Sequence, residues 1–449
     1  MTFGWDIPKI RYNQKKTYAV KRKMAEYEDR ERFIPFQKSE IIRLICEEGT
    51  LSNEDQDKFR MFCKILESIY HFEFHTKAEE LKKNYFPLNP DRDTRMIREY
   101  SDRDIRECED NLLEKFKEIL NNANYEEVTE KDLEYAVEKE SLFNISLFID
   151  FDDFESQLIF RRGVKQKKIA FRKWFFKKLE ADIPIFERVA VLVKFKDKAY
   201  FETKKRKNLK FAPGTMIIKL FKNIPKADIE MLFPNTQVRM RLKDILMMGG
   251  TAIGGGVAVF LKAGAGLIAM ASVFWFMTRS FVSTGGELPS LGPAEISGMV
   301  GGASALAAIG AFLVKQWNSY KNRKIQFMKT LGDNLYFKNL DNNAGVFHHI
   351  TDDAEEEECK EAILAYYFLL KSESGLTEPD LDSFIEQWFE KKQDVMVDFE
   401  IKDALRKLKE LELCRTSQQN GQDMYQAVSL DSACERLDYI WDNYFQFNI

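Results

Sequence analysis

Two apolar stretches separated by a short connector constrain this chain more than any other feature of its sequence. The stretch 245–276 contains a single charged residue, Lys262, and the stretch 296–314 contains none. As a helix, the second stretch spans about 28 Å, close to the ~30 Å hydrocarbon thickness of a membrane. The sequence therefore predicts an integral membrane protein, anchored by a transmembrane helical hairpin within residues 244–316.

The first apolar stretch is too long for one upright helix, and three interpretations of it stay open. It forms one tilted helix, or residues 245–261 lie in the membrane interface, or two short helices turn at Lys262. A lysine at the bilayer centre costs about 2.5–3.5 kcal/mol on insertion scales, whereas near an interface its ammonium group reaches the headgroups. We therefore expect Lys262 near an interface, with a charge in a transport path as the alternative.

The charges around the hairpin predict its orientation. The connector 279–295 carries one arginine and two glutamates, whereas both flanks of the hairpin are basic. The basic residues are Arg239, Arg241 and Lys243 before it and Lys315, Lys321, Arg323, Lys324 and Lys329 after it. Because cytoplasmic flanks are enriched in lysine and arginine, two spans place both termini in the cytoplasm. The first residues resemble neither a signal peptide nor a transit peptide, so we expect a multi-pass protein of the cell inner (plasma) membrane.

Small residues recur at a spacing of four within the hairpin. The rows are Gly250/Gly254, Gly298/Gly302 and Ala303/Ala307/Ala311. This spacing lets helix backbones approach closely. The rows pack the hairpin on itself, or they support a homo-oligomer.

Composition places most of the chain in water. Charged residues make up 31% of the 449 residues, and the formal net charge of −4 argues against a general polyanion binder. Six cysteines occur without a CxxC pair, which indicates a reducing compartment and argues against a disulfide framework or a zinc ribbon.

The predicted fold is an α+β membrane protein with soluble regions before and after the hairpin in the sequence. Residues 1–130 form a helical domain, because apolar residues follow the helical period after a capping box at Ser52 and Asp55. Residues 131–243 form a small α+β sheet domain beside the membrane, because apolar residues alternate along 143–151, 189–195 and 216–220.

The region after the hairpin has its own pattern. Residues 317–354 are predicted to be a linker. Residues 355–449 predict three helices, a β-hairpin around Asn420-Gly421 and a last helix. This order is typical of a winged-helix-like domain.

Basic residues cluster within the sheet domain. They are Lys165, Lys167, Lys168, Arg172, Lys173, Lys177 and Lys178, followed by Lys204, Lys205, Arg206 and Lys207. The clusters form solvated loops between strands, or they contact anionic lipid headgroups. Nucleic acid is the least favoured partner, because no stacking aromatic residues are interleaved with the lysines.

Four segments carry a resemblance to a known family. They are 31–36 (ERFIPF), 85–91 (YFPLNPD), 221–243 and above all 334–358, which contains the string NLDNNAGVFH. In these segments the chain resembles a family of two-span membrane proteins of unknown function that includes transmembrane protein 143. The resemblance implies a membrane location and a paired-span anchor, and it brings no catalytic residues.

A few residues are candidates for metal chemistry. His71, His75 and Glu79 are spaced along one helical strip, and His348 joins them as a ligand if it folds close, which predicts a divalent metal site. A polar helix face that packs on another domain explains the same spacing. The acidic run 352–358 is interpreted as a solvated helix start, with divalent-ion binding as the alternative. No other cofactor is predicted.

These observations favour a scaffold over an enzyme. We expect a membrane-anchored scaffold or adaptor whose C-terminal domain binds a protein partner. One alternative is a membrane-tethered metal-dependent enzyme. The other is a winged-helix regulator that binds DNA through Lys402, Arg406, Lys407 and Lys409, a set diluted by neighbouring acidic residues.

Overall fold

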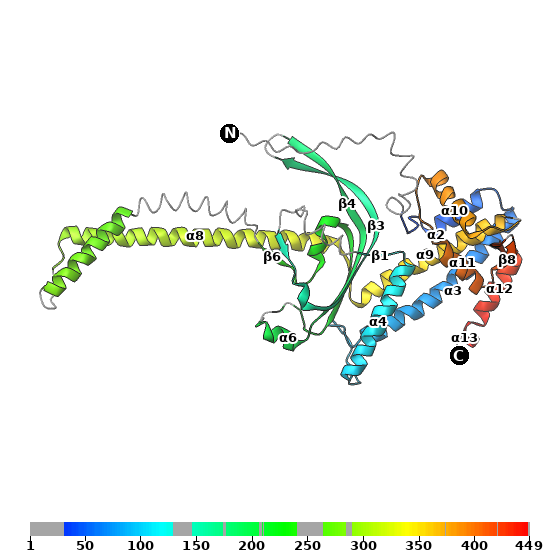
Figure 1. The fold of residues 1–449 in the computed structure, drawn as a ribbon, viewed down its shortest axis with the longest axis horizontal. Coiled ribbons are helices and arrows are strands. Elements are labelled where there is room, and N and C mark those ends of the chain that lie inside the picture. Colours follow the sequence, from blue (N-terminus) through cyan, green and yellow to red (C-terminus); the bar gives the residue numbers. More distant parts are fainter. Residues whose placement is uncertain are drawn as a thin grey trace. The chain divides into compact units, whose positions relative to one another are not determined.

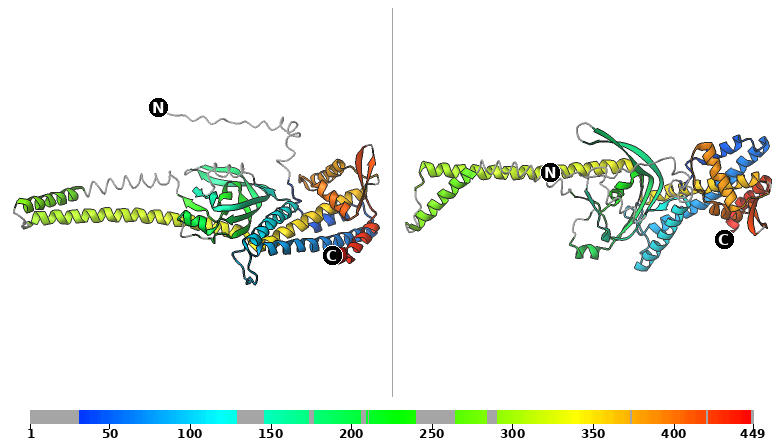
Figure 2. Two further views of the ribbon diagram at one scale, coloured as in Figure 1. Left: turned by 60° about the horizontal axis from the view of Figure 1, so that its bottom comes forward. Right: turned by 45° about the horizontal axis from the view of Figure 1, so that its top comes forward.

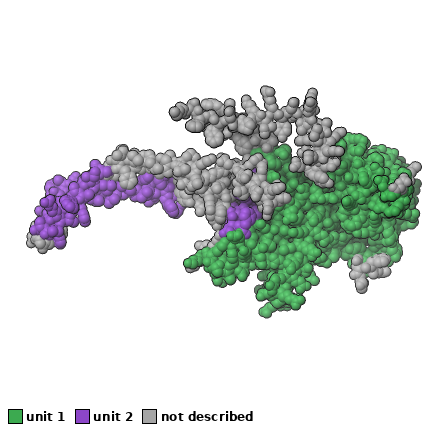
Figure 3. Space-filling view, viewed as in Figure 1, with its two compact units in different colours: residues 1–129, 152–226, 339–449 green, residues 130–151, 227–338 purple. Residues whose placement is uncertain are grey.

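The computed structural model describes residues 31–128, 146–173, 177–205, 209, 211–239, 264–283, 290–372, 374–419 and 421–447. The chain forms two compact units (Figure 3). Unit 1 comprises residues 1–129, 152–226 and 339–449, and unit 2 comprises residues 130–151 and 227–338. This division differs from the predicted domains 1–130, 131–243 and 355–449, because their apolar faces meet in one hydrophobic core.

The central element of unit 1 is the helix α9 (Ala344–Lys371). It is buried along most of its length, and the helices α2 (Lys38–Glu47), α3 (Asn53–Tyr85) and α4 (Asp102–Asn122) pack on it (Figures 1 and 2). The predicted helix start at Ser52 is confirmed, since its hydroxyl accepts a hydrogen bond from the backbone N–H of Asp55 at 3.2 Å. Helix α3 ends at Tyr85, just before Pro87 and Pro90, because proline does not continue a helix.

A five-stranded antiparallel sheet covers one side of these helices. Its order is β1 (Glu126–Glu127), β3 (Phe154–Lys173), β4 (Lys177–Phe195), β5 (Met216–Pro225) and β7 (Asn339–Asn342). One sheet face, with Phe160, Leu192 and Ile218, belongs to the core shared with the helices. On the other face Phe195 stacks on Phe211, whose segment includes the short helix α6 (Lys198–Thr203).

The strand predictions are partly confirmed. The alternating segments 189–195 and 216–220 lie in β4 and β5. The basic cluster 165–178, for which loops between strands were one interpretation, instead lies on β3 and β4. A strand is predicted from alternating polar and apolar residues. The consecutive lysines interrupt this alternation, so the sequence does not indicate a strand there.

The C-terminal elements follow the predicted order. They are α10 (Glu378–Gln393), α11 (Ile401–Glu410), β8 (Cys414–Gln419), β9 (Gln422–Ala427), α12 (Leu430–Asp442) and α13 (Tyr444–Phe447). Leu376, between α9 and α10, bonds to Tyr425 on β9 through two backbone hydrogen bonds of 2.9 and 2.8 Å.

The predicted linker 317–354 is mostly helical, which corrects the sequence prediction. Helix α8 (Pro293–Lys338) continues to the start of β7, and α9 begins at Ala344 instead of near residue 355. As a result, the acidic run 352–358 lies inside a buried helix and is not a solvated helix start. Glu357 and Glu358 are only 1% and 4% exposed.

Unit 2 contains the apolar helices. A helix covers Gly264–Ser283, and α8 follows it. A small sheet pairs β2 (Ser146–Phe148) with β6 (Gln237–Arg239). The 3-10 helices η1 (Phe151–Asp153) and η2 (Lys226–Leu232) lie next to these strands in sequence, and η2 begins directly after Pro225.

Candidate functional site

Two helices of unit 2 are long and apolar enough to cross a membrane. They are Gly264–Ser283, with 20 residues, and Pro293–Ser319, with 27 residues. Their most apolar windows are only 6% and 17% buried within the chain, and Trp275 is 70% exposed. The assignment of these helices as candidate membrane spans rests on their length and composition alone. Lys262, the interface segment 245–261 and the Gly250/Gly254 row lie outside the described residues.

The two helices pack on each other through glycine. A Cβ atom on Gly302 would lie 2.3 Å from Cβ of Met270, and one on Gly266 would lie 2.6 Å from the carbonyl oxygen of Gly301. The Gly298/Gly302 row therefore packs the hairpin on itself. The Ala303/Ala307/Ala311 row is exposed in this chain.

The predicted metal ligands are not assembled into a metal site. The Nδ1 atom of His71 lies 2.9 Å from Oε2 of Glu355, and the Glu79 carboxylate accepts a hydrogen bond from Lys82 at 2.7 Å. This bond is the main cause of the lowered pKa of Glu79, to which the nearby His75 and His348 contribute. Within the described ranges, which include all four predicted ligands, no group of three or more His, Cys, Asp or Glu residues is placed to hold a metal ion.

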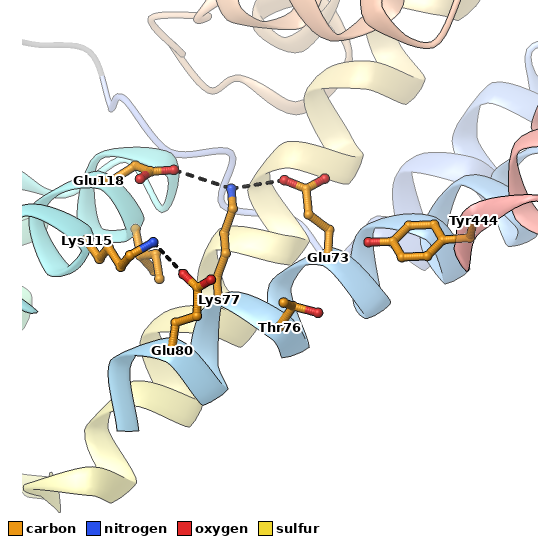
Figure 4. Close-up of a pocket in the computed structure, with 8 residues that line it drawn as sticks. Glu73, Thr76, Lys77, Glu80, Lys115, Glu118 and Tyr444 are labelled. Atoms are coloured by element: carbon orange, nitrogen blue, oxygen red, sulfur yellow. Dashed lines mark hydrogen bonds and ion pairs between the residues drawn. The ribbon is translucent and has the colours of Figure 1, made fainter. Parts of the chain in front are cut away.

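A small cavity lies between α3, α4 and α13. It has a volume of about 240 Å³ and is lined by Glu73, Thr76, Lys77, Glu80, Lys115, Glu118, Ile119 and Tyr444. Figure 4 shows Lys77 between two glutamates, at 3.0 Å from Glu73 and 3.5 Å from Glu118, and Lys115 against Glu80. Because both lysines are paired and the volume is below the about 300–1,000 Å³ of typical ligand pockets, we do not assign a substrate to it.

The most unusual chemistry of unit 1 is a buried charge cluster between α9 and α11. The Lys407 ammonium contacts the Glu358 carboxylate, lies 3.1 Å from Oε2 of Glu361 and 2.8 Å from Oδ2 of Asp403. Asn124 donates to the other oxygen of Glu361 at 2.9 Å. Two buried carboxylates, those of Glu358 and Glu361, and the partly exposed carboxylate of Asp403 thus face one buried lysine. Buried carboxylates in such a cluster are stable only if one of them is protonated or if each has a cationic or hydrogen-bonding partner.

Burial raises the pKa of Glu358 from 4.5 to about 7, because desolvation outweighs the attraction of Lys407. The pKa of Glu361 is raised for the same reason. The second oxygen of Glu358 is buried with no hydrogen-bond partner in the part of the chain that the structure describes, and the hydroxyl of Tyr70 is in the same situation. The cluster therefore holds a proton at a pH where an exposed glutamate is ionised.

We expect the chain to lose stability as the pH rises from about 4.5 to about 7. In this window the folded chain keeps the proton on Glu358 that the unfolded chain releases, so the free energy of unfolding falls by about 3 kcal/mol and then levels off. The substitution Glu358→Gln should flatten this part of the profile. Urea unfolding in mild detergent at several pH values measures it, with the exposed Glu54→Gln as the control. Equal profiles for Glu358→Gln and wild type would contradict the assignment.

A second buried charge pair, Glu357 and Lys360 on α9, binds the backbone of the segment 31–36. Glu357 accepts a hydrogen bond from the backbone N–H of Ile34 at 3.0 Å. Lys360 donates to the carbonyl oxygens of Ile34 and Phe36 at 2.7 and 3.2 Å and to Glu357 at 2.8 Å. One of the segments that carried the family resemblance is therefore a structural contact of the core helix.

Asn343 joins two further segments of that resemblance. Its Oδ1 atom accepts hydrogen bonds from the Tyr85 hydroxyl at 2.8 Å and from the backbone N–H of Ile218 at 3.1 Å, and its Nδ2 atom donates to Asp91 at 2.5 Å. Its φ of 53° is in the region that non-glycine residues rarely adopt. The segments 85–91 and 339–348 thus meet at one buried amide.

Helix α11 presents little unpaired positive charge. Lys407 is buried in the cluster, Arg406 bonds to Asp403 and Glu410, and Lys409 lies 4.6 Å from the ring centroid of Tyr425. Of the four basic residues considered for DNA contact, Lys402 is thus the one exposed residue whose charge no described acidic group or ring engages. This arrangement disfavours the DNA interpretation.

Comparison with known proteins identifies part of the chain. A family model described as "Protein of unknown function (DUF3754)" matches residues 186–345, which run from β4 through the apolar helices to the start of α9. The match supports a domain of unknown function and gives no support for the resemblance to the transmembrane protein 143 family. No solved structure matches the chain.

Proposed function

We propose that this protein is a membrane-anchored scaffold that holds soluble, protein-binding regions at the cytoplasmic face of the cell inner membrane. The observation that carries the proposal is the pair of helices Gly264–Ser283 and Pro293–Ser319, whose apolar side chains are mostly uncovered within the chain. A bilayer is the environment in which such surfaces are stable. At the end of the second helix Lys321 lies 5.7 Å from the ring centroid of Trp317, a pair of residue types that favours the membrane interface.

Alkaline carbonate extraction tests the anchor. We expect the full chain to stay with the membrane pellet after the wash and to enter solution only with detergent, because integral helices resist extraction. The matched control is a peripheral membrane protein of the same cells, which the wash releases. Release of this chain with that control would contradict the anchor.

The C-terminal region supports the second part of the proposal. An isolated bridge pairs Leu376, just before α10, with Tyr425 on β9 of the hairpin β8–β9. The order helix, bridge, two helices and hairpin supports the proposal of a winged-helix-like domain. Because the basic residues of α11 are largely paired, we favour a protein over DNA as its partner. Phe384 on α10 and Trp441 on α12 are 48% and 43% exposed and offer apolar anchors for such a contact.

Affinity purification in mild detergent tests the scaffold. We expect a stoichiometric partner to co-purify with the wild-type chain and to be lost or strongly reduced with Phe384→Glu or Trp441→Glu. Met61→Glu is the matched control, since Met61 is a 56% exposed apolar residue on α3. Purification of the chain alone would remove the main support of the scaffold, whereas salt-dependent binding of duplex DNA would favour the regulator.

A further inference from the structure

Helix α8 continues far beyond its candidate membrane span. It has 46 residues, and the span Pro293–Ser319 accounts for 27 of them (Figures 1 and 2). At a rise of 1.5 Å per residue the whole helix is about 69 Å long, more than twice the ~30 Å hydrocarbon thickness. We call residues 320–338 the stalk. Its charged residues are Lys321, Arg323, Lys324, Lys329, Asp333 and Lys338. Charges at this density stay out of hydrocarbon, so the stalk continues α8 in water.

One side of α8 packs on the other helix of the hairpin. A Cβ atom on Gly298 would lie 3.1 Å from Cγ2 of Val273, and one on Gly302 would meet Met270. Ala305, on the same side, is only 6% exposed. The positions 298, 302 and 305 follow one another at steps of four and three, which places them on one side of a helix. The helix Gly264–Ser283 therefore occupies this side of α8.

The opposite side of α8 carries a second row with the same spacing. Position 300 is turned by about 160° from position 298 around a helix with 3.6 residues per turn. From there, steps of four and three alternate up to position 335, which is a heptad repeat. We call this row the α8 seam. Its residues are Val300, Ser304, Ala307, Ala311, Val314, Asn318, Lys321, Ile325, Met328, Gly332 and Leu335. All of them are exposed except Leu335, which is partly buried.

The α8 seam needs a partner in the stalk. Lipid surrounds its apolar residues within the span, whereas Ile325 and Met328 face water and are 61% and 44% exposed. An apolar row on a helix in water is stable when it packs on another surface. The helix Gly264–Ser283 packs on the opposite side of α8, so it does not cover this row. The partner must come from elsewhere.

A second copy of this chain fits the α8 seam. A heptad repeat that runs through span and stalk selects a helical partner of the same length and period. The α8 of a second copy has both, and a shared bilayer holds the two helices parallel and at the same depth. Identical positions then meet across a two-fold axis. Ile325 and Asn318 are seven residues apart and occupy equivalent heptad positions, where a β-branched residue favours a parallel pair and a polar residue fixes its register.

The charges of the stalk are compatible with this pairing. Lys321 is the one charged residue of the α8 seam. It follows the span by two residues, so headgroup phosphates offset its repulsion between two copies. Lys329 is outside the seam, and salt screens its repulsion over about 8 Å at physiological ionic strength.

We propose that two copies of this chain pair along the α8 seam and form a parallel homodimer. The proposal rests on the membrane anchoring proposed above and extends it from one hairpin to a pair of hairpins. The stalks then hold the soluble regions of both copies at one place on the membrane.

Disulfide cross-linking of the full chain in its own membranes tests the proposal. Cells express two copies with different epitope tags, each with the same introduced cysteine, and the isolated membranes are oxidised. I325C and M328C should give at least about tenfold more linked dimer than Q326C or D333C, because a disulfide needs Cβ atoms about 3.5–4.5 Å apart. Gln326 and Asp333 are exposed on the same stalk but lie outside the α8 seam. The wild-type chain gives the background, since its six cysteines are buried or partly buried.

A disruptive variant gives a second readout. V314C, in the span, should also form the linked dimer. Adding I325E/M328E removes two apolar contacts and places like charges opposite each other, so this dimer should fall about tenfold. Adding Q326E, the matched control outside the α8 seam, should leave it unchanged.

The outcomes separate the homodimer from the anchor. Release of the chain by alkaline carbonate refutes the anchor. A chain that stays in the membrane, yet links equally at all four stalk positions or at none of them, refutes the pairing alone. A product linked through I325C that never contains both tags assigns the α8 seam to a different protein and also overturns the proposal. The same holds if I325E/M328E and Q326E reduce linking through V314C alike.

Discussion

Replacing Lys407 with methionine should destabilise the chain by about 3–5 kcal/mol. The side chain is only 4% exposed and neutralises Glu358 and Glu361, which are themselves 5% and 4% exposed. Without the ammonium group, two buried carboxylates face each other in a medium that stabilises charge poorly. The free energy of unfolding from urea titration of the full chain in mild detergent measures the loss.

Two further variants show whether the loss comes from the unpaired charge. The triple variant K407M/E358M/E361M replaces the cluster with apolar side chains of similar size and should recover most of the lost stability. Lys402→Met, on the exposed side of the same helix, should change the free energy of unfolding by less than about 0.5 kcal/mol. If Lys407→Met behaves like Lys402→Met, the cluster contributes nothing to the docking of α11 on α9.

Asn343→Ala should cost about 3 kcal/mol. The substitution removes the acceptor of the backbone N–H of Ile218 and the donor to Asp91. It also removes one of the two acceptors of the Tyr85 hydroxyl, which keeps the carbonyl oxygen of Met216 at 2.9 Å. Each net hydrogen bond contributes about 1 kcal/mol, and the buried N–H of Ile218 left without an acceptor adds about 1–3 kcal/mol. Urea unfolding in the same detergent is the measurement.

The variant Asn343→Gly separates the contribution of the side-chain amide to stability from that of the backbone conformation. Glycine loses the same hydrogen bonds but adopts a φ of 53° without strain, so its loss should be smaller than that of alanine. The expected order of stability is wild type, Asn343→Gly, Asn343→Ala. Equal stability of the alanine variant and wild type would show that the amide does not join the two segments.

Several local features of the fold are predictable from neighbouring residues. The stripe of Phe59, Leu66 and Phe74 is buried on α3 as its period of 3–4 residues predicts. The hydroxyl of Thr377 caps α10 by accepting from the N–H of Asp380 at 3.3 Å. The last pair of the hairpin β8–β9 is Gln419↔Gln422, in agreement with the turn that the intervening Asn-Gly sequence predicts. These features depend on residues within a few positions of one another.

The acidic run shows where sequence reasoning fails. Residues 352–358 are typical of an exposed helix start, and the partners that make Glu357 and Glu358 buried are distant in sequence. Ile34 contacts Glu357 over a separation of 323 residues, and Lys407 contacts Glu358 from α11. Because the lysine that neutralises a buried glutamate can be anywhere in the chain, the residues around the glutamate do not indicate that it is buried.

The sequence by itself determines the apolar hairpin, the caps and periods of the helices, and the order of the C-terminal elements. Each follows from the chemistry of adjacent residues and from the 1.5 Å rise of a helix. Only the tertiary structure decided that three separated stretches share one core around α9, that Lys407 and Lys360 neutralise buried glutamates, and that Asn343 joins Tyr85 to β5. These contacts depend on which groups, distant in sequence, meet in the low-dielectric interior. A buried polar or charged group without a partner is costly there, so each must be paired.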